Sequence, residues 1–229
     1  MKILVATQDE PFYLADNIQY LINNIPNSIT IDSFFILKHD PTVGSKKNRI
    51  LNIISVFGTS FFIYYLIKFL FSKIKKKSVK QICKINDIEI INVDGNINNK
   101  DYIEIIKKRK IDLIVSILGS QIFKKELINT PKIGIINLHT SLLPKYRGVM
   151  PTFWVLKNNE KKTGVSVFFV DQGIDSGPII AQKEITIDQR NQALLIKKTK
   201  KIGMELIVES LNKILSNNYE LIQNNDSDS

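Results

Sequence analysis

The sequence predicts an α/β protein in which the strands of a mostly parallel sheet alternate with helices. Two observations indicate this class: short apolar runs typical of buried strands recur along the chain, and segments with helical periodicity separate them. A strand at Lys2–Thr7, a helix at Tyr13–Ile25 and a strand at Thr30–Leu37 form the opening βαβ unit. We expect the amino terminus to enter the sheet directly, with no cleavable signal before it.

The alternation continues through the second half of the chain. Pro151, after a loop rich in Pro and Gly, suits the first turn of a helix because its missing N–H has no partner there. The last residues, Asn224–Ser229, are polar and are expected to fray. The length suits one domain, which we place at residues 1–220 with a polar tail at 221–229. The remaining predicted elements are strands at Glu89–Val93, Asp112–Leu118, Ile133–His139, Val165–Val170 and Ile179–Ile187, and helices at Lys100–Arg109, Thr152–Asn158 and Asn191–Leu215.

The chain is basic, with 32 Lys and Arg against 22 Asp and Glu and a net charge of +10. Such a charge attracts phosphorylated small molecules, nucleic acid or anionic lipid headgroups. The lysine runs are typical of solvated helix faces, and no RNA-binding signature accompanies them. We therefore expect no nucleic acid as a partner, and the pattern does not indicate an oligomeric state.

Cysteine and histidine are too scarce for a disulfide framework or a metal cluster. The single cysteine, Cys83, suits a small buried position on a helix in a reducing cytosol. The two histidines are His39, in a predicted turn, and His139. We therefore expect no metal and a cytoplasmic location.

One segment breaks the pattern, a mostly apolar stretch at Ile50–Phe71 within an insert at about 46–80. Its length approaches that of a membrane span, but polar residues and Gly58 interrupt it and basic residues flank both ends. Two interpretations rank ahead of a true span. A helical hairpin packed on the domain is favoured, and an interfacial helix that docks on anionic lipid at the inner face of the membrane is the other.

Three polar side chains indicate a catalytic site. Asn137 and His139 lie two residues apart at the end of a predicted strand, so their side chains should point to the same side. An asparagine amide stabilises an oxygen that gains negative charge, and a histidine beside a carboxylate such as Asp175 moves a proton near neutral pH. Each residue alone is more often a turn former or a satisfied polar neighbour. Together they indicate acyl transfer to an amine that attacks directly.

These residues lie in motifs that strongly resemble the formyltransferases that use 10-formyltetrahydrofolate. That family includes glycinamide ribonucleotide transformylase, methionyl-tRNA formyltransferase and the sugar N-formyltransferases. The resemblance is dense from about Asp112 to Gln182 and implies a Rossmann-like fold, a twisted and mostly parallel sheet with helices on both faces and its site at the carboxyl ends of the strands. The motifs are Asn137-Leu-His139-Thr-Ser-Leu-Leu-Pro144-Lys-Tyr-Arg147-Gly148, Thr163-Gly-Val-Ser-Val167 and Asp171-Gln-Gly-Ile-Asp175-Ser-Gly-Pro178.

The resemblance also implies roles for individual residues. Asn137 and His139 would hold the formyl oxygen as it becomes an oxyanion, and Asp175 would orient His139 and, through water, help take the proton from the amine. Tyr146 and Arg147 would bind the acceptor, Arg147 through a phosphate. Phe153 and Trp154 are interpreted as helix core rather than as a stacking platform. The residues expected to bind 10-formyltetrahydrofolate, the co-substrate, are Leu118, Gly119, Gln121, Ile122, Phe123, Ser141, Leu142, Leu143, Pro144, Asp171 and Gly173.

The chain departs from the family in the region that selects the acceptor. Thr7-Gln-Asp-Glu-Pro11 stands where glycinamide ribonucleotide transformylase has a Gly-Ser-Asn type phosphate loop. The chain also ends too soon after its last helix for the barrel with which methionyl-tRNA formyltransferases hold tRNA. We expect a small phosphorylated amine as acceptor, an amino sugar linked to a nucleotide or a lipid. The alternatives are methionyl-tRNA or glycinamide ribonucleotide as acceptor, and a non-catalytic folate-binding or membrane-associated protein on the same fold.

Overall fold

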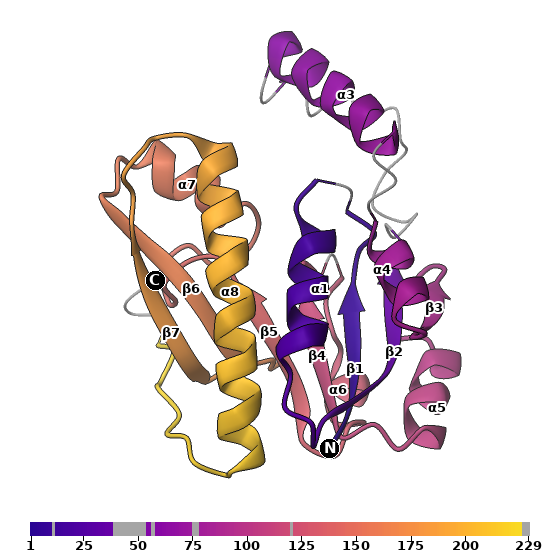
Figure 1. The fold of residues 1–229 in the computed structure, drawn as a ribbon. Helices are drawn as coiled ribbons and strands as arrows, with labels where there is room; N and C mark the ends of the chain where they lie inside the picture. Colours follow the sequence, from indigo (N-terminus) through magenta and orange to yellow (C-terminus); the bar gives the residue numbers. More distant parts are fainter. Residues whose placement is uncertain (11, 39–53, 56–57, 75–77, 120, 226–229) are drawn as a thin grey trace.

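A single sheet forms the centre of the computed structural model, which describes residues 1–10, 12–38, 54–55, 58–74, 78–119 and 121–225. The strand order is β3-β2-β1-β4-β5-β6-β7 (Figure 1). The strands from β3 to β5 pair in parallel, whereas β6 is antiparallel to both β5 and β7. This arrangement confirms the predicted α/β class with a mostly parallel sheet. The strands are β1 Lys2–Thr7, β2 Thr30–Leu37, β3 Glu89–Val93, β4 Leu113–Ile117, β5 Gly134–His139, β6 Lys162–Phe169 and β7 Ile179–Thr186.

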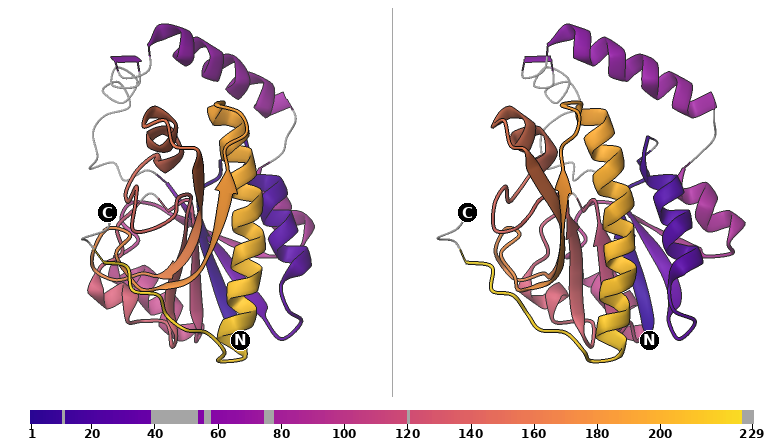
Figure 2. Two further views of the ribbon diagram at one scale, coloured as in Figure 1. Left: turned by 90° about the vertical axis from the view of Figure 1, so that its left-hand side faces the viewer. Right: turned by 60° about the vertical axis from the view of Figure 1, so that its left-hand side comes forward.

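Helices cover both faces of this sheet. One apolar cluster joins the sheet to α1, α4 and α8, and a second joins the opposite face to α5 and α6. Figure 2 shows α8, in yellow-orange, running along the first of these faces. The helices are α1 Leu14–Asn24, α3 Thr59–Ile74, α4 Val79–Ile85, α5 Lys100–Lys108, α6 Lys125–Ile128, α7 Pro151–Lys157 and α8 Gln192–Leu215.

Strand β1 illustrates how the sequence produces two cores. Ile3 and Val5 belong to the cluster under α1 and α8, while Leu4 and Ala6 belong to the cluster under α5. All four are fully buried. Because successive side chains of a strand point to opposite faces, a central parallel strand must be apolar at every position, as the run KILVA nearly is.

Two predictions about individual residues need correction, and a third is confirmed. Asn224 is buried rather than frayed, because its side chain has hydrogen-bond partners inside the fold; residues 226–229 lie outside the described residues. Trp154 is 42% exposed and so is not helix core, since α7 buries Pro151, Thr152 and Val155 instead. Cys83 is buried on α4 as predicted, and burial raises the pKa of its thiol to about 12.

The apolar insert contains a helix, α3, among its described residues, and the predicted hairpin packed on the domain stays a prediction because much of it lies outside them. Helix α3 lies apart from the layered body in all three views of Figures 1 and 2. A contact between the rings of Phe12 and Phe69, with centroids 6.5 Å apart, links it to the segment before α1. No helix among the described residues is both long and apolar enough to cross a membrane. Residues 39–53 of the insert region lie outside the described residues.

Candidate active site

The candidate site lies where β4 and β5 end at the same edge of the sheet. β1 lies between β2 and β4, so the strand order reverses beside this edge, the position at which open α/β sheets usually bind ligands. In the parallel ladder Ser116 of β4 is the register partner of Asn137 in β5. The two side chains therefore lie side by side on one face of the sheet, and both line a cavity.

His139 and Asp175 form a pair next to this cavity. The Nδ1 atom of His139 lies 3.3 Å from Oδ2 of Asp175, and Nε2 lies 2.7 Å from the backbone carbonyl of Tyr146. A carbonyl only accepts hydrogen bonds, so Nε2 donates and carries the proton of the neutral ring. Nδ1 is then the nitrogen that can take a second proton, and Asp175 is placed to accept the resulting hydrogen bond.

The loop between β5 and α7 holds both members of this pair. The carbonyl of Tyr146 contacts His139, and the backbone N–H of Gly148 donates to Oδ2 of Asp175 over 2.8 Å. Tyr146, Gly148 and Met150 all have positive φ angles, which turn the chain sharply enough to aim these backbone groups inward. Gly148 adopts its φ angle of 84° without steric cost, whereas the positive φ angles of Tyr146 and Met150 are strained.

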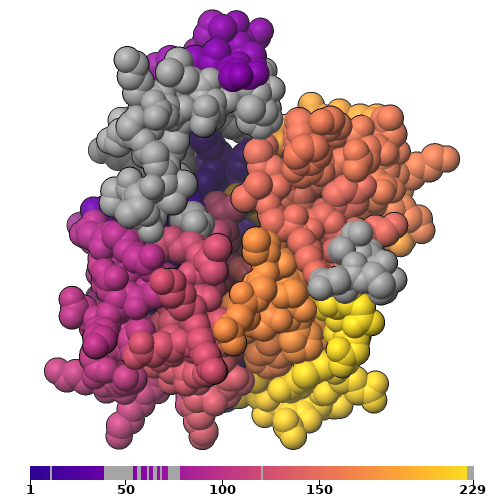
Figure 3. Space-filling model, turned by 180° about the vertical axis from the view of Figure 1, so that it is seen from behind, coloured from indigo at the N-terminus to yellow at the C-terminus, as the bar shows by residue number. Residues whose placement is uncertain are grey.

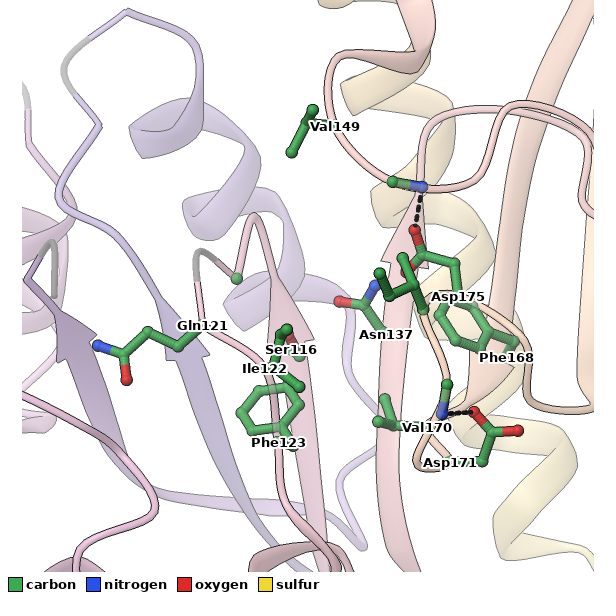
Figure 4. Close-up of a pocket in the computed structure, with 14 residues that line it drawn as sticks. Ser116, Gln121, Ile122, Phe123, Asn137, Val149, Phe168, Val170, Asp171 and Asp175 are labelled. Atoms are coloured by element: carbon green, nitrogen blue, oxygen red, sulfur yellow. Dashed lines mark hydrogen bonds between the residues drawn. The ribbon is translucent and has the colours of Figure 1, made fainter. Parts of the chain in front are cut away.

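A cavity of about 490 Å³ extends from this pair (Figure 4). This volume lies within the range typical of small-molecule sites, about 300–1,000 Å³. Asn137 and Asp175 form one wall, and Ile122, Phe123 and Val170 lie on other sides of the same space. Figure 3 shows the molecule from behind, hollowed between the magenta and pink segments and the coral and orange segments. The other lining residues are Ser116, Gly119, Gln121, Gly148, Val149, Phe168, Asp171, Gly173 and Ile174.

The structure brings half of the residues predicted for the site into the wall of the cavity. Eight of them line the cavity: Gly119, Gln121, Ile122, Phe123, Asn137, Asp171, Gly173 and Asp175. His139 is buried and lies behind Asp175 rather than in the wall. The others outside the wall are Leu118, Ser141, Leu142, Leu143, Pro144, Tyr146 and Arg147.

The Ser141–Pro144 segment supports the site instead of lining it. The backbone N–H of Leu143 donates to Ser166 Oγ, and that hydroxyl donates to the carbonyl of Ser141. Gln182 Nε2 donates to the carbonyl of Leu143 over 2.7 Å. Strands β6 and β7 thus fix the segment that leads into the Tyr146–Gly148 loop. None of the four lines the cavity, and the polar groups of Ser141 and Leu143 bond within the fold, so their contact with folate stays a prediction.

Gln121 also has a supporting role. Its Oε1 accepts from the backbone N–H of Ile97, and its Nε2 donates to the carbonyls of Lys38 and Gly95. Figure 4 shows the side chain pointing away from Asn137. Gln121 therefore joins the ends of β2, β3 and β4 below the cavity, and its polar atoms are taken by backbone groups.

Tyr146 and Arg147 contact other parts of the chain. The hydroxyl of Tyr146 donates to Glu160, and burial together with this bond raises the pKa of Tyr146. Arg147 Nη2 donates to the carbonyl and to Oδ1 of Asn224, at 2.8 and 2.9 Å. The structure thus gives Arg147 a partner in the carboxyl-terminal segment rather than a free position for a phosphate.

Comparison with known proteins places these residues in a family. The model of the formyl transferase family matches residues 71–211, which is well over half of the chain and contains the whole cavity. The chain belongs to the formyl transferase family. The expected resemblance is therefore confirmed, and so is the fold.

Relatives and solved structures of this family differ in what they act on. A methionyl-tRNA formyltransferase from Thermodesulfovibrio yellowstonii is 44% identical over 115 residues, covering 50% of this chain and 37% of that protein. Two solved structures have the same fold. Phosphoribosylglycinamide formyltransferase from Bacillus halodurans has a TM-score of 0.65 at 20% identity, covering 93% of this chain and 95% of that one. An N-formyltransferase from Helicobacter canadensis, in complex with folinic acid and dTDP-3-aminofucose, has a TM-score of 0.60 at 21% identity, covering 99% and 68%.

Several residues that line the cavity of this formyl transferase family member escaped prediction from the sequence. Ser116, Val149, Phe168, Val170 and Ile174 line the cavity but look like ordinary strand or loop residues. The alternation of side chains along β4 and β5 could have identified Ser116, since it is the register partner of Asn137. Asn224, which contacts Arg147 and the loop of Asp175, had no sequence signal, because it lies in a polar segment 49 residues beyond Asp175.

Proposed function

We propose that this chain transfers a formyl group from 10-formyltetrahydrofolate to an amine. The observation that carries the proposal is the position of Asn137 and Asp175 in the wall of one cavity, with His139 3.3 Å from Asp175. An uncharged amide donor and a carboxylate–imidazole pair are the groups that this reaction needs. The match covers only 37% of the Thermodesulfovibrio methionyl-tRNA formyltransferase, which is more than twice as long as the matched segment. The activity of the whole protein is therefore part of the proposal.

The cavity suits the formyl donor in shape and in chemistry. Apolar side chains such as Ile122 and Phe123 offer surface to a flat ring system, while backbone groups lie exposed at Gly119 and Gly173. A side chain at Gly119 would come within 2.8 Å of Ser116 Oγ. Among the described residues that buried hydroxyl has no hydrogen-bond partner, so a polar ligand group would satisfy it.

The chain's own groups then account for the reaction. As the acceptor amine attacks the formyl carbon, the amide of Asn137 donates a hydrogen bond to the formyl oxygen, which gains negative charge. The Asp175–His139 pair accepts the proton that the amine loses, and Nδ1 of His139 can take this proton from Asp175. When the bond between the formyl carbon and the donor nitrogen breaks, the Asp175–His139 pair returns the proton to the donor. No residue of the chain forms a covalent intermediate.

For the acceptor we propose an amino sugar that carries a nucleotide or a lipid. Two observations support this class: the structure that binds dTDP-3-aminofucose aligns with 99% of the chain, and Thr7–Pro11 lacks the Gly-Ser-Asn type of phosphate loop. Methionyl-tRNA is the second candidate, favoured by the 44% identity with the Thermodesulfovibrio protein. Glycinamide ribonucleotide is the third.

A donor and acceptor panel tests both levels of the proposal. The protein is incubated with 10-formyltetrahydrofolate and, separately, dTDP-amino sugars, UDP-amino sugars, methionyl-tRNA or glycinamide ribonucleotide, and release of tetrahydrofolate is followed. Turnover with an amino sugar supports the full proposal, and turnover with tRNA alone overturns the acceptor. With the active acceptor, His139→Ala and Asn137→Ala should each lower kcat about 100-fold or more, while exposed Asn225→Ala should not. Donor binding without turnover on any acceptor would favour a non-catalytic folate-binding protein.

A further inference from the structure

We propose that α3 docks this protein on a membrane surface that contains anionic lipid. The helix lies parallel to the surface, with its apolar side chains between the headgroups and the acyl chains. The proposal concerns binding alone and does not depend on formyl transfer.

One face of helix α3 carries a row of exposed apolar side chains, the apolar stripe. Ile63, Leu66, Ile67 and Leu70 follow the i, i+3, i+4, i+7 spacing of one helix face, and each is between 45% and 55% exposed. Phe71, beside Leu70, is 62% exposed. A contiguous row of large apolar side chains is uncommon on a monomer surface and marks an interaction site.

The described parts of the chain do not cover this stripe. Figures 1 and 2 show α3 apart from both helical layers, and the ring contact of Phe69 with Phe12 involves a position outside the stripe. The helix has 16 residues, a length of roughly 24 Å, which is less than the hydrocarbon core of about 30 Å. It therefore suits a position along a membrane surface better than one across it.

The charge of the chain indicates what covers the stripe. Residues 41–86, which contain α3, include ten Lys and Arg and no Asp or Glu. The rest of the chain has 22 basic residues (Lys and Arg) and 22 acidic residues (Asp and Glu). The whole net charge of +10 therefore belongs to the segment around the apolar stripe. An apolar stripe in a segment of sequence rich in Lys and Arg complements a bilayer that offers anionic headgroups above an apolar interior.

The same charge argues against two other occupants. A second copy of residues 41–86 would bring ten further Lys and Arg against the first ten, and like charges oppose such pairing. Nucleic acid would satisfy the charge but offers no apolar phase for Ile63, Leu66, Ile67 and Leu70.

Cosedimentation of the full chain with vesicles tests the proposal. Vesicles of phosphatidylcholine with roughly one-third phosphatidylglycerol should bind the protein, and vesicles of phosphatidylcholine alone should bind it at least 10-fold more weakly. Raising the ionic strength should weaken binding, since salt screens the attraction. Equal binding to both kinds of vesicle, or none to either, would overturn the proposal.

Paired variants then identify the surface. Leu66→Ser with Leu70→Ser should weaken binding to the anionic vesicles by about 10-fold or more, because two side chains lose their apolar environment. The control is Leu194→Ser with Leu221→Ser, two leucines of similar exposure elsewhere, which should change binding less than about 2-fold. Equal loss in both pairs contradicts the assignment, and so does a dimer in vesicle-free solution that the first pair dissociates. Thermal melts of both pairs, expected to match the parent, exclude unfolding as the cause.

Discussion

The side-chain amide of Asn224 donates a hydrogen bond of 2.8 Å to the backbone carbonyl of Asp175, 49 residues earlier in the chain. The same amide donates to the carbonyl of Gly177 over 3.0 Å. Asp175 has a φ angle of 48°, a left-handed conformation that costs free energy for any residue with a side chain. Asn224 therefore bonds to the residue that faces both His139 and the cavity where its backbone conformation is unfavourable, and we predict that it positions Asp175.

Replacing Asn224 by alanine should lower kcat about 10-fold while changing KM for the formyl donor less than 3-fold. The substitution leaves the carbonyls of Asp175 and Gly177 without their donor, at a cost of about 1–3 kcal/mol. It also removes one of the two hydrogen bonds from Arg147, while the bond to the backbone carbonyl of residue 224 remains. Steady-state kinetics with the active acceptor provide the measurement.

Two further variants separate positioning from general stability. Asn225→Ala, the exposed neighbour, should behave like the parent. Asn224→Asp keeps an oxygen for Arg147 but turns an acceptor toward the two carbonyls, so it should be as slow as the alanine variant. A parent-like rate for Asn224→Asp would mean that the contact with Arg147, not the contact with Asp175, is what matters.

Asp175→Asn should lower kcat at least 100-fold with little loss of folded protein. In the parent, Oδ2 of Asp175 accepts from the N–H of Gly148 and lies 3.3 Å from His139 Nδ1. An amide keeps one acceptor oxygen for Gly148 but cannot take a proton at neutral pH, so the proton relay with His139 is lost. Rates across a pH range, with circular dichroism as a folding control, would measure this. A variant within 3-fold of the parent would contradict the assignment of Asp175.

Gly119→Ala should raise KM for the formyl donor by about 10-fold. The new methyl group would lie 2.8 Å from Ser116 Oγ, too close for a carbon atom, so the cavity wall must shift. Adding Ser116→Ala removes the opposing oxygen and should restore part of the loss. Ser116→Ala alone is the reference, because Ser116 Oγ is itself proposed to bond a polar group of the donor. If Gly119→Ala raises KM by the same factor with and without Ser116→Ala, the contact is not the cause.

The sequence predicted the sheet well because its central strands are apolar at every position. Lys2–Thr7 and Thr30–Leu37 were predicted with the boundaries that β1 and β2 have. The short helix α6 was missed, because four residues carry too little periodicity to reveal a helix. Strand β6 begins at Lys162, three residues before its apolar run, since antiparallel pairing with β7 extends into polar sequence.

The candidate site could be predicted only where it is built from local motifs. Asn137 and His139 come from one strand end and Asp175 from one loop, so their spacing identified them. Ser141–Pro144 belongs to the same motif, yet its polar groups bond to Ser166 and Gln182 of β6 and β7, a long-range arrangement that spacing alone does not reveal. The burial of Asn224 and the exposure of α3 also depend on tertiary structure, so local sequence did not reveal them.

The acid stability of the chain should depend on an ion-pair cluster remote from the site. Arg109 donates two hydrogen bonds to Glu89 and one to Asp32, at 2.7, 2.8 and 3.0 Å. Burial tends to raise the pKa of Asp32, but bonds from Arg109, Ser33 and Lys2 outweigh it and the pKa is lowered. A carboxyl whose native pKa lies below its unfolded value stabilises the fold at neutral pH. That stability is lost as the pH falls through the unfolded and then the native pKa.

Arg109→Met should therefore destabilise the protein by about 1 kcal/mol at pH 7, roughly 2–4 °C in Tm for a chain of this size, and by less below pH 4. Thermal melts at several pH values measure the difference. Lys107→Met is the matched control, because its salt bridge to Glu104 lies on the exposed surface of α5, which ends just before Arg109, and should contribute nothing measurable. If the difference in Tm between Arg109→Met and the parent stays constant down to pH 3, Arg109 does not lower the pKa of Asp32.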